Sequence, residues 1–79
     1  MDGYNYKLLH YATAPRATAG RLSQYIDGNF VDSWAGKLRG KFVSLEGQWK
    51  FKTKAEALEL ARKYRQLCID EAKNKGLLD

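Results

Sequence analysis

The chain of 79 residues is poor in the side chains that bind metals, form disulfides or carry out catalysis. It has one cysteine, Cys68, and one histidine, His10, so it can form neither an internal disulfide nor a structural zinc site built from Cys and His. No apolar run approaches the roughly 18 residues that a membrane-spanning helix needs. These absences predict a cytoplasmic protein that holds no metal and has no contact with a membrane.

Motifs of catalysis and cofactor binding are missing as well. The seven glycines form neither of the phosphate-binding patterns GxxxxGK[ST] and GxGxxG. The acidic residues lack the spacing of a calcium loop or of a catalytic carboxylate pair. His10 lies among tyrosines, without an acid–base partner near it in the sequence. We therefore expect a protein that is not an enzyme and binds no small-molecule cofactor.

The composition is that of a folded domain. Hydrophobic residues make up 44% of the chain and aromatic residues 13%, which is too much for a disordered tail. A chain of this length allows one domain, residues 1–79, with a core of modest size. It contains no internal repeat and no linker-like stretch.

The positive charge is concentrated in one segment. The net charge is +5, and residues 37–66 alone carry nine basic and three acidic side chains, a net charge of +6. Such a local basic field attracts nucleic acids or acidic protein surfaces and speeds encounter with them. Lysines that merely keep a surface solvated would give the same composition.

A helix is expected over residues 54–75. Thr53 and Glu56 have the spacing of a capping box, and Gly76 suits the left-handed residue that ends a helix. Apolar residues then recur at intervals of three and four, which predicts one buried face: Ala57, Leu60, Ala61, Tyr64, Leu67, Cys68 and Ala72.

Residues 41–52 read as a hairpin with a two-residue turn at Glu46 and Gly47. In that register the aromatic side chains Phe42, Trp49 and Phe51 lie on one side and meet the helix. Val43, Leu45 and the lysines at 41, 50 and 52 then form the outer face.

The N-terminal half gives weaker signals. Residues 4–11 are rich in tyrosine and favour a strand, and residues 12–20 favour a loop. Asp27 and Gly28 predict a hairpin turn, although the apolar spacing of residues 29–39 would also suit a short helix, and Gly36 argues against that helix. The fold class we expect is α+β, a small antiparallel sheet packed on one long C-terminal helix, with the short second helix near 29–39 as the alternative.

The stretch Gly47–Ala57, GQWKFKTKAEA, resembles the strand-to-helix junction of two families, whose junction often reads Phe-x-Thr-(x)-x-Glu-Ala. These are the arm-binding N-terminal domains of tyrosine integrases and the plant ethylene-response-factor DNA-binding domains, in which a three-stranded sheet packs on a C-terminal helix. The resemblance covers about residues 41–75 and implies DNA contact through the outer sheet face, here by Lys41, Lys50 and Lys52. The helix is also similar to those of small phage proteins that bind host enzymes.

Two functions follow from these patterns. The first is a small nucleic-acid-binding module of phage or mobile-element type, with DNA favoured over RNA, which contacts phosphates through a basic sheet face. The alternative is a small phage-type protein that binds and inhibits or redirects a larger host protein complex, such as defence or transcription machinery, whose surface is acidic or itself binds nucleic acid. The candidate binding residues are the same for both: Lys37, Arg39, Lys41, Lys50, Lys52, Lys54 and Arg62.

Overall fold

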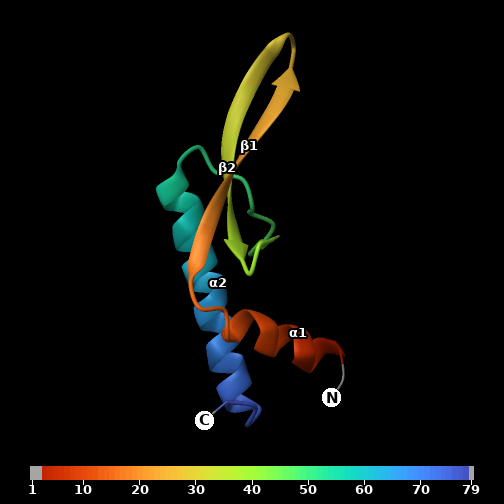
Figure 1. The fold of residues 1–79 in the computed structure, drawn as a ribbon, viewed down its shortest axis with the longest axis vertical. Helices are drawn as coiled ribbons and strands as arrows, with labels where there is room; N and C mark the ends of the chain where they lie inside the picture. The colour runs from red at the N-terminus through yellow and green to blue at the C-terminus, as the bar shows by residue number, and fades with distance from the viewer. Residues whose placement is uncertain (1–2, 79) are drawn as a thin grey trace.

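The computed structural model describes residues 3–78 and has the expected α+β fold (Figure 1). Helix α1 (Gly3–Ala12) is followed by β1 (Ala17–Ile26), β2 (Asn29–Leu38), the short β3 (Lys41–Phe42) and the long helix α2 (Lys54–Asn74). The strands form one antiparallel sheet in the order β1-β2-β3. The molecule is elongated, 50 × 23 × 21 Å, because the β1–β2 hairpin projects beyond the helices (Figure 1).

Helix α2 begins and ends where the sequence predicts. The Thr53 hydroxyl accepts a hydrogen bond from the backbone N–H of Glu56 at 3.2 Å, so it caps the helix N-terminus. At the other end, the N–H of Leu77 donates to the carbonyl of Ala72 and the N–H of Gly76 to that of Lys73, which is a Schellman motif. The predicted buried face is confirmed except at Leu67, which is 47% exposed, and Tyr64, which is partly buried.

The β1–β2 hairpin settles the choice between strand and helix for residues 29–39 in favour of the strand. Asp27 and Gly28 have φ angles of +50° and +82°, which two-residue hairpin turns require. Ten residue pairs continue from this turn down to Ala17 and Leu38. The alternative helix near 29–39 is therefore wrong, and the loop expected over 12–20 is shorter because β1 begins at Ala17.

The strand expected over residues 4–11 is also wrong, because these residues lie in helix α1. Leu8, Tyr11 and Ala12 are buried, and their spacing of three and four places them on one side of this helix. The Tyr11 ring packs edge-on against Tyr64 of α2, with ring centroids 5.6 Å apart. The preference of tyrosine for strands is small, and packing against α2 outweighs it.

The expected hairpin of residues 41–52 forms only at its turn. Leu45 and Gln48 exchange two backbone hydrogen bonds of 3.0 Å around the turn, as predicted. Beyond the turn the two halves of the segment separate, and each pairs with β2. Val43 donates a hydrogen bond to the carbonyl of Gly36, and Phe51 exchanges two hydrogen bonds of 2.8 Å with Trp34. The free edge of β2 thus satisfies backbone groups that a hairpin would have paired with each other.

These pairings with β2 reverse the predicted orientation of several side chains in residues 41–52. Val43 is 5% exposed and belongs to the core, and Leu45 packs against the core from the side. Phe42 and Trp49, which were expected to meet the helix, are 48% and 40% exposed. Among the three aromatic residues of this segment, Phe51 alone packs against the core.

The sheet and α2 come unusually close at Gly36. A Cβ atom on this residue would lie 2.7 Å from the carbonyl oxygen of Ala57 and 2.9 Å from the Cβ of Ala61. Glycine and two alanines thus let the strand and the helix touch by their backbones. This contact fixes which face of the sheet α2 covers.

Candidate nucleic-acid interface

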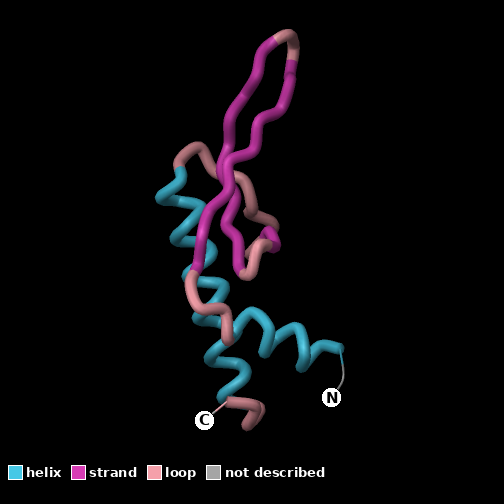
Figure 2. Tube along the Cα trace, in the orientation of Figure 1, coloured by secondary structure: helices cyan, strands magenta, loops and turns pink. Residues whose placement is uncertain are grey.

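The face of the sheet opposite α2 is not covered by a helix, because α1 packs against α2 (Figures 1 and 2). Side chains alternate along a strand, so Gly36 faces α2 and its neighbour Lys37 points to the other side. Phe42 pairs with Lys37 across β2 and β3 and shares its side. We call this uncovered side the open face.

Two pairs of a lysine and an aromatic ring lie on this part of the sheet. The Lys37 ammonium lies 5.0 Å from the centre of the Phe42 ring, and that of Lys50 lies 4.8 Å from the Trp49 ring. Lys50 also donates a hydrogen bond of 3.0 Å to the side-chain oxygen of Gln24 on β1. Each lysine is therefore held near a ring rather than extended freely into solvent.

The arrangement suits a phosphate-bearing ligand. The two ammonium groups can contact phosphate oxygens, and the half-exposed rings of Phe42 and Trp49 offer flat surfaces for bases or sugars. The two rings line one shallow hollow together with Val43 and Ser44. The chemistry offered is binding by charge and stacking.

Two other lysines of the candidate set lie on the α2 side of the sheet. Lys41 pairs with the buried Leu38, which places it on the α2 side of the sheet edge. The Lys54 ammonium lies 5.8 Å from the centre of the Trp34 ring, also on the α2 side. Lys52 and Arg62 are exposed, before α2 and along it respectively. The single basic face expected from the sequence is therefore wrong, because Lys41 and Lys54 lie on the opposite side of the sheet from Lys37 and Lys50.

Arg39 has a structural role. Its guanidinium donates hydrogen bonds to the carbonyl oxygens of His10, at 2.8 Å, and Thr13, at 3.0 Å, at the end of α1. Arg65 similarly donates to the carbonyl of Ala14 at 2.7 Å. These two arginines satisfy the carbonyl of His10 in the last turn of α1 and those of Thr13 and Ala14, which directly follow the helix. Arg39 is thus committed to holding α1 in place.

Replacing Arg39 with asparagine should therefore loosen α1. Asparagine tolerates the φ angle of +51° that residue 39 adopts, so the turn should keep its shape while the side-chain hydrogen bonds are lost. We expect a loss of about 1 kcal/mol in the free energy of unfolding and faster amide exchange in α1. Lys41→Asn, which removes the same charge two residues away, should change neither by a comparable amount.

Sequence reasoning missed Gln24, Phe42 and Trp49 as members of this surface. The aliphatic side chains of Val43 and Leu45 alternate with Phe42 along the chain and suit a core. If they are buried, the rings of Phe42 and Trp49 must point to the opposite side, and this is the signal that would have placed them. Gln24 carries no such signal, because its contact with Lys50 depends on how residues 41–51 return to β2.

Other kinds of site lack support in the part of the chain that the structure describes. Across residues 3–78, no three His, Cys, Asp or Glu side chains gather as metal ligands would. Over the same residues, neither helix has an apolar stretch long enough to cross a bilayer. Comparisons of the chain with protein-family models, curated proteins and solved structures give no match.

Proposed function

We propose that the protein is a non-enzymatic DNA-binding module that contacts its ligand through the open face. The observation that supports this proposal is the pairing of Lys37 and Lys50 with two half-exposed aromatic rings on the sheet face that α2 leaves free. The resemblance of residues 41–75 to sheet-and-helix DNA-binding domains implies contact through the outer sheet face, and of the lysines it implies, Lys50 lies on the open face.

The electrostatics favour the same ligand. The protein carries a net charge of +5, which raises the local concentration of a polyanion and speeds encounter with it. The width of the DNA major groove admits a two-stranded β-ribbon, so a small twisted sheet can present its side chains there. The lysines would contact phosphates, and Gln24 is placed to orient one of them.

The test compares two double variants by fluorescence anisotropy with a labelled DNA duplex at several salt concentrations. Lys37→Gln/Lys50→Gln removes both open-face charges, and the control Lys41→Gln/Lys73→Gln removes two exposed charges from other surfaces. Each phosphate contact contributes about 0.9 to the slope of log affinity against log salt. We expect the first variant to lose about 2 from this slope and the control to lose less than about 0.5.

Three results would contradict the proposal. Equal losses in the two variants would mean that binding follows total charge rather than the open face. Absence of binding at low salt would remove the proposed function altogether. A host protein that co-purifies after nuclease treatment, together with no DNA affinity, would favour the alternative function of a protein-binding inhibitor.

A further inference from the structure

The outer half of the β1–β2 hairpin stands away from the rest of the molecule (Figures 1 and 2). Trp34 is the residue of β2 nearest the turn that still pairs with a further segment, through Phe51. We call residues 22–33, which lie beyond this pair, the arm. The hydrogen bond from Lys50 to Gln24 holds the base of the arm. A two-stranded hairpin without a packing partner is at best marginally stable in water, so the end of the arm gains stability from any surface that covers it.

The end of the arm carries large apolar side chains on both of its faces. Tyr25 and Phe30 form a cross-strand pair with ring centroids 5.2 Å apart, and they are 68% and 76% exposed. Ile26 and Val31, on the opposite face by strand alternation, are 47% and 46% exposed. A contiguous exposed apolar patch of this kind marks an interaction surface more often than a solvated one.

The arm differs in charge from the rest of the chain. It contains Asp27 and Asp32 and no basic residue, a net charge of −2, whereas the remaining residues sum to +7. A phosphate backbone would repel the arm, and a basic surface with apolar content would attract it. The rest of this same chain offers such a surface.

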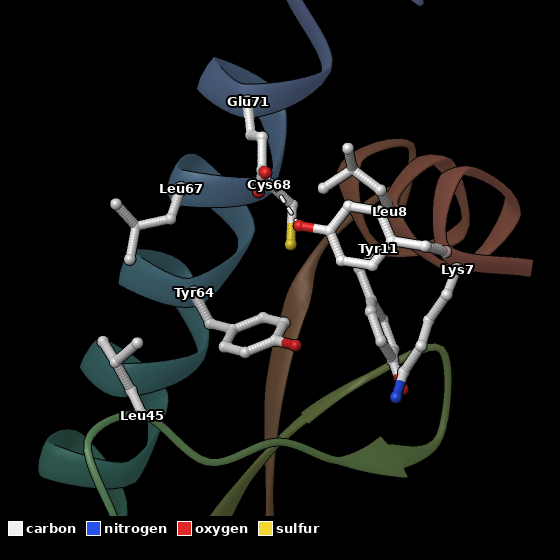
Figure 3. A pocket seen from close by; sticks show the side chains of 9 residues that line it. Lys7, Leu8, Tyr11, Leu45, Tyr64, Leu67, Cys68 and Glu71 are labelled. Carbon is white, nitrogen blue, oxygen red and sulfur yellow. Dashed lines mark hydrogen bonds between the residues drawn. The ribbon is translucent and has the colours of Figure 1, made fainter. Parts of the chain in front are cut away.

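An apolar cleft lies between α1 and α2 (Figure 3), and these helices meet at the end of the molecule opposite the arm (Figure 1). Its volume is about 250 Å³, larger than the cavity of about 150 Å³ that takes up a benzene ring. Leu8, Tyr64 and Leu67 supply apolar lining, and Lys7 supplies a positive charge. Burial raises the pKa of the Cys68 thiol in this lining, which keeps it neutral at physiological pH.

One side of the cleft is held by contacts between its two helices. The Tyr4 hydroxyl of α1 donates a hydrogen bond of 2.7 Å to Glu71 of α2, and this bond raises the pKa of Tyr4. The Lys75 ammonium lies 4.3 Å from the centre of the same tyrosine ring. The Lys75 ammonium also lies 4.0 Å from the Glu71 carboxylate and balances its charge. Lys7 is then the charge of the cleft lining that an acidic partner would meet.

We propose that the end of the arm of one copy docks in the cleft of a second copy. The rings of Tyr25 and Phe30 would fill apolar space beside Leu67, and Asp27 would lie near Lys7. Because arm and cleft lie at opposite ends of a molecule 50 Å long, two copies related by a two-fold axis can run antiparallel and make this contact twice. The two contacts then close a dimer and leave no free arm.

The first test measures the mass of the nuclease-treated protein by sedimentation over about 1 to 500 μM. We expect it to rise from 9.0 kDa at the lowest concentrations towards twice that value. Phe30→Ser and Leu67→Glu should each raise the dissociation constant at least tenfold. Tyr6→Ser, which removes a ring that is 67% exposed and lies outside both surfaces, should leave the dissociation constant unchanged. Circular dichroism checks that each variant is folded.

A mixture of the two variants distinguishes arm-into-cleft docking from other modes. Phe30→Ser keeps the cleft and Leu67→Glu keeps the arm, so equal amounts of the two should form a heterodimer with one intact contact, although each is monomeric alone. If the arms paired with each other instead, Leu67→Glu would remain a dimer, which would overturn the proposal. A wild-type protein that stays monomeric at every concentration would overturn it as well, and would leave the arm for a different protein.

Discussion

Replacing Gly36 with alanine should lower the free energy of unfolding by about 2 kcal/mol. The added Cβ would lie 2.7 Å from the carbonyl oxygen of Ala57, which is backbone and cannot turn aside. The helix would have to move away from the sheet, and packing along both elements would loosen. A domain of this size has a total stability of about 4–12 kcal/mol, so the shift should be plain in a urea titration.

Gly20→Ala is the matched control, since it makes the same change on the neighbouring strand. There the new Cβ would lie 2.9 Å from Cδ of Lys37, the flexible side chain of an open-face residue, which can shift at little cost. We expect a change within about 0.5 kcal/mol, of either sign. Equal losses at the two positions would show that sheet and helix are not in close contact at Gly36.

Leu38→Ala should lower the free energy of unfolding by more than Gly36→Ala does, by about 3 kcal/mol. Among residues 3–78, Leu38 is the largest side chain with no exposed surface, and it lies in the core beside residues of both helices. Its removal leaves a cavity that the small neighbouring alanines cannot fill. The loss should appear in the midpoint of a thermal or urea transition recorded by circular dichroism.

Leu67→Ala provides the control for this prediction, because the same change is made at a side chain that is 47% exposed. We expect a loss below about 1 kcal/mol when it is measured at low protein concentration. Comparable losses at the two leucines would contradict a core that is centred on Leu38 and leaves Leu67 at the surface.

The C-terminal helix could be predicted from the sequence because its signals are local. Thr53, Glu56 and Gly76 specify the two ends through contacts within a few residues. The turns at Asp27–Gly28 and Glu46–Gly47 are predictable for the same reason, since both contain a glycine at a positive φ angle, which glycine adopts at no steric cost. Features determined by neighbours in the chain are thus accessible without a structure.

Features determined by partners distant in the sequence cannot be predicted in this way. Residues 4–11 fold as α1 because Leu8 and Tyr11 pack on α2, and nothing within the segment itself signals that partner. The two halves of residues 41–52 separate because β2 has a free edge at Trp34 and Gly36. A hairpin and two separate pairings with β2 satisfy the same backbone groups, so the sequence pattern could not decide between them.

The candidate site is affected in the same way. The basic segment is evident from the sequence, and Lys37 and Lys50 do lie on the open face. Arg39 is grouped with them because its charge is visible in the sequence, whereas its hydrogen bonds to the end of α1 are not. The sequence pattern places the rings of Phe42 and Trp49 in the core, because an aromatic side chain is more often buried than exposed.

The two proposed surfaces divide the molecule by charge. The open face is basic where Lys37 and Lys50 lie, and the arm that extends from the same sheet has a net charge of −2. DNA that lies on the open face should therefore avoid the end of the arm, which stays free for the second copy. Binding of DNA and self-association should then be separable by mutation.

The most direct measurement for the central proposal is the map of backbone amide and tryptophan indole shifts in two-dimensional NMR while a short DNA duplex is added. We predict that the largest changes fall at Lys37, Phe42, Trp49 and Lys50, with little change at Asp27 and Phe30. Changes centred on the exposed side of α2, or on the end of the arm, would contradict the assignment of the open face as the DNA-binding surface.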